Sequence, residues 1–240
     1  MSSATCPNGT ASCRDCRMNP LCLPLALRDG DLATLDEKIE RGKPLQRKEN
    51  VFFVGDNYRG VYVVRSGAVK SAITNSDGSE QITGFYLAGE IFGWDGLAQG
   101  RHTNTATALE TTAICAIPLE RMEELSVTLP DLRRHFMQLM SREIAVDQQM
   151  LALLSKSSAN RRLATFLVSL SNRLARQKLS ASRFRLPMAR AEIANYLGLT
   201  VETISRVFGR FQTQQLIAVD KRDISLLALD ELRALSEETE

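Results

Sequence analysis

Three cysteines near the start of the chain have the spacing of ligands for a metal ion or an inorganic cluster. Cys13, Cys16 and Cys22 follow a C-x2-C-x5-C pattern, and Cys115 lies far downstream. Thiols this close are rarely packing residues, because a short loop cannot bury them all unless they bind something. An iron–sulfur cluster takes four cysteine thiolates, so three from the loop and one from a folded domain would complete the set. Zinc is the alternative, since C-x2-C is also a zinc-binding step and sulfur ligands suit either metal.

Neighbouring residues leave this choice open. Cys115 lies in the apolar run Ala113–Ile117, and an isolated cysteine in a strand is usually a small buried hydrophobe. Arg14 and Arg17 lie inside the cysteine-rich loop and are candidates to offset the charge of four thiolates. An ordinary solvated surface would explain both arginines equally well.

A second stretch has the pattern of a DNA-binding helix, predicted from Val201 to Gln212 with Thr200 as its N-cap. Its predicted buried stripe is Val201, Ile204, Phe208 and Phe211. Its opposite face carries Glu202, Ser205, Arg206 and Gly209. Arginine can bond guanine, glutamate can accept from the cytosine amine, and serine can bond a base or a phosphate. Arg210 and Gln212 are placed to reach phosphates, which position a protein on DNA without specifying sequence.

The surrounding pattern predicts a winged helix-turn-helix. A helix at Met188–Leu197, a turn at Gly198–Thr200 and strands at Ile217–Val219 and Asp223–Leu227 flank the DNA-binding helix. From Lys156 to Arg222 there are thirteen Lys and Arg against three Asp and Glu, although the net charge of the chain is only +2. This surplus favours a polyanion as partner, with a solvated basic surface as the alternative.

Between these two stretches, the sequence pattern predicts a β-rich region followed by a long helix. A short helix is expected at Asp31–Arg41. Short β-rich runs separated by turn residues then predict a barrel or jelly-roll-like sheet. These runs are Val51–Val54, Gly60–Arg65, Ala68–Thr74, Gln81–Tyr86, Thr105–Glu110 and Thr112–Ile117.

The helix predicted from Pro130 to about Ser155 has two apolar faces. One is a coiled-coil seam, which predicts a homodimer: Met140, Ile144, Asp147, Leu151 and Leu154. The other is expected to face the chain's own sheet: Leu132, Phe136, Leu139, Glu143, Val146 and Met150. Asp147 would repel its own copy in a dimer, which gives the hypothesis that the resting dimer is weak. A buried core helix in a monomer is the alternative.

Composition narrows the class of protein. A chain of 240 residues fits one large domain or two ordinary ones. It has no apolar run of eighteen residues and no signal-peptide pattern, so we expect a cytoplasmic protein without a membrane partner. There the five cysteines are expected to be ligands or free thiols rather than disulfides. A Ser–His–Asp set, a P-loop and a nucleotide fingerprint are all missing, so we expect no enzyme activity.

The cysteine spacing and the runs Glu80–Phe85 and Leu199–Arg206 resemble the bacterial oxygen-responsive FNR regulators, in the cyclic-AMP receptor protein superfamily. The resemblance spans about residues 13 to 228. It implies an α+β fold with an N-terminal β-roll sensory domain, a long dimerisation helix and a C-terminal winged helix-turn-helix. The implied boundaries are 1–28 for the cysteine-rich segment, 29–128 for the β-roll, 129–157 for the helix and 158–240 for the DNA-binding domain.

The resemblance also implies roles for individual residues. The matching ligands of an oxygen-labile [4Fe-4S] cluster are Cys13, Cys16, Cys22 and Cys115, whereas Cys6 has no counterpart. The implied DNA-contacting residues are Glu202, Ser205, Arg206, Val201, Thr203 and Arg210, which act on double-stranded TTGAT-type inverted repeats. The tip Thr74–Glu80 resembles a surface that touches RNA polymerase.

Cyclic AMP is not an expected ligand. Cyclic-nucleotide sensors in the superfamily use a glutamate for the ribose and an Arg-Ser or Arg-Ala pair for the phosphate. In this chain Gly93 is followed by Trp94, and Asn104–Thr105 replaces the pair. A phosphate buried here would lack a cation, which is costly.

Together these features predict an oxygen-sensing regulator that binds DNA as a homodimer when it holds its cluster. The alternatives are a regulator that binds zinc or no metal, and an iron–sulfur protein that transfers electrons.

Overall fold

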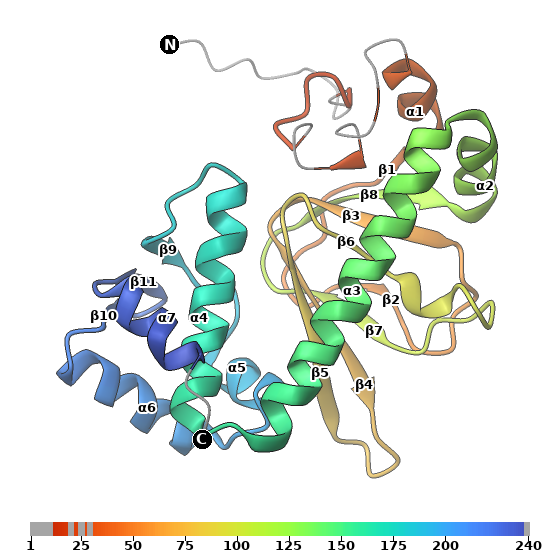
Figure 1. Cartoon of the computed structure of the whole chain (residues 1–240). Helices are drawn as coiled ribbons and strands as arrows, with labels where there is room; N and C mark the ends of the chain where they lie inside the picture. Colours follow the sequence, from red (N-terminus) through yellow and green to blue (C-terminus); the bar gives the residue numbers. More distant parts are fainter. Residues whose placement is uncertain (1–11, 19–21, 24–26, 28–30, 238–240) are drawn as a thin grey trace. The chain divides into compact units, whose positions relative to one another are not determined.

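The computed structural model describes residues 12–18, 22–23, 27 and 31–237. Cys6 and much of the predicted segment 1–28 therefore lie outside the described residues. The chain divides into two compact units, Met1–Arg142 and Glu143–Glu240. Helix α3, Pro130–Lys156, begins in the first unit and ends in the second (Figure 1). The predicted α+β class is confirmed.

The first unit is built on two four-stranded antiparallel sheets, with strand orders β1-β8-β3-β6 and β2-β7-β4-β5. The strands are β1 Glu40–Arg41, β2 Asn50–Phe52, β3 Gly60–Ser66, β4 Ala68–Thr74, β5 Glu80–Leu87, β6 Ile91–Phe92, β7 Thr105–Ala108 and β8 Ala113–Pro118. Both sheets contribute side chains to one apolar cluster of Phe52, Val64, Val69, Phe92 and Ala106. The predicted β-roll is confirmed, although the sequence pattern does not predict the two-residue strands β1 and β6.

One glycine lets β3 and β8 approach each other closely. Gly60 has φ +141°, and a Cβ on it would lie 2.0 Å from the carbonyl oxygen of Ile117.

Replacing Gly60 by alanine is expected to lower the free energy of unfolding by about 3–5 kcal/mol, because a clash adds to backbone strain. Gly55 is the matched control, because it has φ +87° but a Cβ on it would meet nothing within 4 Å. Gly55→Ala should cost only about 1–2 kcal/mol in urea denaturation, and equal losses would contradict the prediction.

Helices share a second core cluster with strands of the β-roll. They are α1 Leu32–Lys38, α2 Leu119–Thr128 and the first half of α3. Pro130 stands at the first position of α3, where the missing N–H costs nothing. Leu132 and Phe136 of α3 are buried in one core cluster with Leu125 of α2 and Leu35 of α1, and Leu139 packs against it. The prediction that this face of α3 meets the chain's own domain is confirmed for these three residues.

Further along α3 the predicted second face is partly wrong. Val146 is 50% exposed rather than turned into a core. It lies beyond the end of the first unit, so the cluster that covers Leu132 and Phe136 does not extend to it.

The second unit is a three-stranded sheet with four further helices. Its helices are α4 Ala159–Arg176, α5 Arg190–Tyr196, α6 Val201–Thr213 and α7 Leu229–Glu237. Its strands, in the order β10-β11-β9, are β9 Arg183–Arg185, β10 Ile217–Asp220 and β11 Asp223–Leu226. The hairpin turn contains Lys221 with φ 54°. The helix, turn, helix and hairpin order predicted from the sequence is confirmed. Every helix in the described part of the chain is too short or too polar to span a bilayer.

Candidate functional site

The described cysteines come together at the core cluster that the helices share with strands of the β-roll. Cys13 is buried in the core cluster, and Cys22 and Cys115 pack against it from partly buried positions. Cys115 lies on β8, where it pairs with Arg41 of β1. All four are thiols rather than disulfides. The structure therefore brings the predicted loop cysteines and the predicted strand cysteine to the same place.

Burial makes these thiols reluctant to ionise. It raises the pKa of Cys13 and of Cys22 to about 12. Charges on Cys115, Cys13 and Cys16 would each raise the pKa of Cys22 further, so the four groups are near enough to repel one another as thiolates. Such a set is stable as thiolates only when a positively charged group binds it.

The donor set at this place is chemically suited to a group that binds thiolates. Four cysteine thiols are present, and four thiolates are the ligand set of an iron–sulfur cluster and also of a structural zinc. Among the described residues, no group of three or more His, Cys, Asp or Glu is arranged to hold a metal ion. The thiols themselves therefore leave the choice between the two metals open.

A cation next to the thiols comes from outside the cysteine loop. Arg41 Nη2 donates to Cys13 Sγ at 3.2 Å, and Arg41 also forms an ion pair with Asp36. Asp36 Oδ1 accepts from the backbone N–H of Cys13 at 2.7 Å. Arg14 and Arg17, the cations suggested by the sequence, are exposed instead. The sequence provides no signal for Arg41, because β1 is too short to predict.

Helix α6 buries one apolar face and presents a polar face to solvent. Its buried residues are Ile204, Val207, Phe208 and Phe211, at the i, i+3, i+4, i+7 spacing of one helix face. Val201, predicted as part of this stripe, is 49% exposed, so that prediction is wrong. Val207 is buried instead, whereas Val201 stands at the first position of the helix and at the edge of the stripe. Thr200 caps the helix as predicted, with Oγ1 accepting from Thr203 N at 3.1 Å.

The polar residues of α6 are available for contact. Glu202 and Arg206 form an ion pair at 3.9 Å with side chains 79% and 69% exposed, and such an exposed pair is easily broken. The Ser205 hydroxyl donates to the carbonyl of Val201 at 2.8 Å. Arg210 Nη1 donates to Asn160 Oδ1 of α4 at 3.1 Å. Thr203, by contrast, is partly buried beside its cap.

Arg162 of α4 fixes the turn before α6, a role that the sequence does not reveal. Its guanidinium donates to the carbonyls of Leu197 at 3.0 Å and Gly198 at 3.4 Å in the turn. It also donates to the carbonyls of Leu154 at 2.9 Å and Ser157 at 2.9 Å, at the end of α3 and just after it. Gly198 has φ +61°, a conformation that glycine adopts without strain. The turn of the helix-turn-helix is thus tied to the end of α3.

The predicted seam of α3 is largely uncovered. Ile144 is 58% and Leu151 is 69% exposed. Met137, seven residues before Ile144, is 60% exposed and extends the same face. Met140 and Leu154 are partly buried, and burial raises the pKa of Asp147. The exposed apolar positions recur every seven residues, as in a coiled-coil seam.

The predicted tip is the exposed turn between β4 and β5 (Figure 1). Asp77 accepts from the backbone N–H of Ser79 at 2.8 Å and from its hydroxyl at 2.6 Å, so the turn has a defined shape.

Two family models match the chain. Residues 43–128 match the cyclic nucleotide-binding domain, and residues 161–235 match the Crp-like helix-turn-helix domain. The transcriptional activator protein Anr of Pseudomonas protegens is 51% identical over 94% of this chain and 93% of its own length. The fumarate and nitrate reduction regulatory protein of Escherichia coli is 46% identical over 95% of this chain and 91% of its own length. The chain belongs to the FNR family.

As an FNR-family member, within the cyclic-AMP receptor protein superfamily, the chain is a transcriptional regulator with a helix-turn-helix DNA-binding domain. Among solved structures, FixK2 from Bradyrhizobium japonicum has a TM-score of 0.76 at 29% identity and covers 84% of this chain and 99% of its own. The resemblance noted from the cysteine and α6 residues is therefore confirmed at the level of the family.

Proposed function

We propose that this FNR-family regulator senses oxygen through a [4Fe-4S] cluster held by Cys13, Cys16, Cys22 and Cys115. A cluster of this kind would supply a redox-active, oxygen-labile group at the thiols. The observation that carries the proposal is the shared core cluster. Cys13 is buried together with Leu132 and Phe136 of α3, and Cys115 packs against the same cluster. A change at the thiols would therefore act directly on the N-terminal half of α3.

In the proposed mechanism the four thiolates tie the N-terminal loop to β8. Arg41 offsets part of their charge through its hydrogen bond to Cys13. When the thiolates are released and reprotonate, the loop is no longer tied to β8, and the packing around Leu132 and Phe136 is weakened. A difference of a few kcal/mol between the two states suffices to switch a two-state dimer.

The proposed active form is a homodimer paired through the seam of α3. Covering Met137, Ile144 and Leu151 with a second copy would bury the exposed apolar positions of the seam. A two-fold dimer places its two recognition helices in successive major grooves, about one helical turn apart. Each α6 would then contact one TTGAT half-site of double-stranded DNA. We assign the base contacts to Glu202, Ser205 and Arg206 and the surrounding contacts to Val201, Thr203 and Arg210. The Thr74–Glu80 tip is the proposed contact with RNA polymerase.

Asp147 is expected to weaken this dimer when the cluster is absent. It lies in the seam between Ile144 and Leu151, and burial already raises the pKa of its carboxyl in the single chain. Asp147→Ala should strengthen dimerisation in air about tenfold, or ~1.4 kcal/mol, since two facing carboxylates no longer repel. Sedimentation equilibrium measures the effect. Gln149→Ala, which changes an exposed residue of α3 outside the seam, is the control, and an equal gain in both variants would sink the hypothesis.

Anaerobic purification tests the function as a whole. We expect a coloured protein that contains iron and sulfide and shifts a TTGAT–N4–ATCAA duplex, and that loses both colour and binding on exposure to air. Colourless protein with zinc or no metal that binds DNA equally well in air would favour the metal-independent regulator. Reversible reduction of a cluster without any effect on DNA binding would favour an electron-transfer protein.

A further inference from the structure

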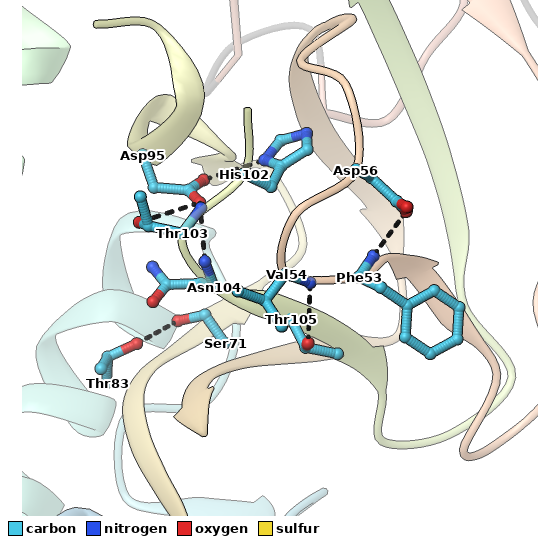
Figure 2. A network of polar contacts seen from close by, with 10 residues as sticks. All are labelled: Phe53, Val54, Asp56, Ser71, Thr83, Asp95, His102, Thr103, Asn104 and Thr105. Atoms are coloured by element: carbon cyan, nitrogen blue, oxygen red, sulfur yellow. Dashed lines mark hydrogen bonds and ion pairs between the residues drawn. The ribbon is translucent and has the colours of Figure 1, made fainter. Parts of the chain in front are cut away.

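A carboxylate lies where several hydrogen-bond donors of the β-roll converge. Asp95 Oδ2 accepts from the backbone N–H groups of Thr103 at 2.7 Å and Asn104 at 3.0 Å, and from the Thr103 hydroxyl at 3.4 Å. His102 Nδ1 donates to Oδ1 at 3.2 Å. Figure 2 shows Asp95 with these three residues around it. Successive backbone N–H groups aimed at one point make an anion-binding nest, and in this chain the anion is the protein's own side chain.

The His102 ring beside Asp95 is held in place by packing. The His102 side chain is 1% exposed and stacks on Phe52 with ring centroids 3.5 Å apart. A carboxylate only accepts hydrogen bonds, so Nδ1 carries a proton, and Nε2 has no partner among the described residues. The Asp95 side chain itself is 13% exposed. The Asp95 carboxylate is therefore largely enclosed, with the exposed Thr103 at the rim of the nest.

The nest sits in the part of the chain that matches the cyclic nucleotide-binding domain. Its N–H groups come from the stretch where Asn104–Thr105 replaces the phosphate-binding pair of cyclic-nucleotide sensors. An incoming phosphate would meet the Asp95 carboxylate instead of a cation, and like charges repel. The nearest arginine in sequence, Arg101, donates to the carbonyl of Gly55 at 2.9 Å. Asn104 Oδ1 is a further buried acceptor without a partner among the described residues.

Asp95 also connects the nest to α3. It belongs to the one-turn helix η2, Trp94–Gly96, and directly follows Trp94 in the chain. The indole of Trp94 meets the ring of Phe136 on α3 edge-on, with centroids 6.2 Å apart. Gly96 is packed so closely that a Cβ there would lie 2.5 Å from the Tyr58 ring. A turn held this tightly transmits the position of Asp95 to the Trp94–Phe136 contact.

We propose that Asp95 is a resident anion that fills the site of a ligand phosphate from within and so fixes the Trp94–Phe136 contact without any nucleotide. Asp95 is thus a positioning residue for α3, and the β-roll needs no small-molecule ligand to hold η2 in place. Removing the carboxylate would leave an empty oxyanion site made of the Thr103 and Asn104 N–H groups. The nest is built from the loop before β7 and from η2 and contains no cysteine. Trp94 and Phe136, by contrast, belong to the core cluster that includes Cys13, so the parent and the variants are compared in the same state, without the iron–sulfur cluster.

Trp94 is the single tryptophan of the chain and reports this contact directly. In the full chain purified in air, Asp95→Ser is expected to shift the tryptophan emission to the red and to increase its quenching by acrylamide. Added inorganic phosphate should reverse the shift in Asp95→Ser and leave the parent unchanged. Cyclic AMP should leave the parent unchanged as well. Phe136→Leu calibrates the readout, since it should shift the emission and not respond to phosphate.

Asp56→Ser is the matched control. Asp56 Oδ2 accepts from the backbone N–H of Phe53 at 2.8 Å in the neighbouring turn, and its side chain is drawn in the same view (Figure 2). The same loss of a carboxylate there should leave the emission of Trp94 as it is. Should Asp95→Ser fail to fold, Asp95→Asn keeps the volume and one acceptor oxygen and should show a smaller red shift. Parental emission in both Asp95 variants, a red shift that phosphate does not reverse, or a cyclic-AMP response in the parent would each overturn the proposal.

Discussion

Replacing Cys16 by serine is expected to produce a folded monomer that binds a TTGAT inverted repeat poorly even without air. Cys16 is partly buried, and as a thiolate it would raise the pKa of Cys22 and of Cys115. Serine is close in size, so the core around Leu132 should remain intact. With one of four ligands lost, the cluster should no longer be bound. The protein should then remain in the monomeric state that the proposed mechanism assigns to released thiols. If coupling amounts to a few kcal/mol, anaerobic affinity should fall about 100-fold.

Gel shift and sedimentation under nitrogen check this result, together with the visible spectrum. Cys6→Ser is the control, because Cys6 has no counterpart among the cysteines of the family pattern. It should keep both the colour and the affinity of the parent. A Cys16→Ser protein that is colourless yet binds DNA under nitrogen as the parent does would show that DNA binding does not need the cluster, and would contradict the proposed mechanism. A double variant Cys16→Ser, Asp147→Ala should regain part of the dimer, since it removes the repulsion that the cluster is proposed to overcome.

Helices and strands could be predicted where apolar periodicity and flanking cap or turn residues agree. Helix α6 was predictable because its apolar positions, its Thr200 cap and its turn glycine Gly198 all agree. Strand β4 was predictable because turn residues flank a β-rich run on both sides. The one error on α6 exchanged Val201 for Val207, since both lie near the edge of the stripe and only packing decides between them.

Features made by long-range contact could not be predicted. Helix α2 buries only Met122 and Leu125, which is too little to produce a clear stripe. Strand β1 exists through its pairing with β8 and has only two residues. Arg41 reaches the thiols by that pairing. Arg162 bonds four backbone carbonyls in two separate segments, two in the turn before α6 and two at the end of α3 and just after it. A single sequence carries no local sign of such contacts.

In the proposed mechanism, α3 connects the thiols with the DNA-binding helices. The thiols and the first half of α3 share a core cluster, and the guanidinium of Arg162 bonds both the end of α3 and the turn that begins α6. Each of these contacts lies within one compact unit, and α3 is the only element that crosses the boundary among the described residues. In the proposed mechanism, pairing of α3 is therefore the step at which a change near the cysteines reaches the DNA-binding helices.

Replacing Arg206 by alanine is expected to weaken binding at each half-site by about 1–3 kcal/mol and to relax the preference for guanine. Its side chain is 69% exposed and held only by weak contacts such as the pair with Glu202, so the fold should not change. Arginine bonds the two acceptors of guanine in bidentate fashion, and alanine bonds neither. Competition gel shifts with TTGAT and TTAAT repeats measure the loss and the change in preference together.

A comparison of Arg210→Ala with Arg206→Ala distinguishes a contact with a phosphate from a contact with a base. Arg210 is tied to Asn160 of α4 and sits later on α6, where we assign it to the DNA backbone. Its loss should weaken both repeats equally and lower the salt dependence of binding by about one unit of slope per half-site. Arg206→Ala should instead leave the salt dependence nearly as it was while the two repeats converge in affinity. If Arg206→Ala weakened both repeats to the same extent, Arg206 would be a phosphate contact, and the base contact on α6 would have to come from another residue of its polar face.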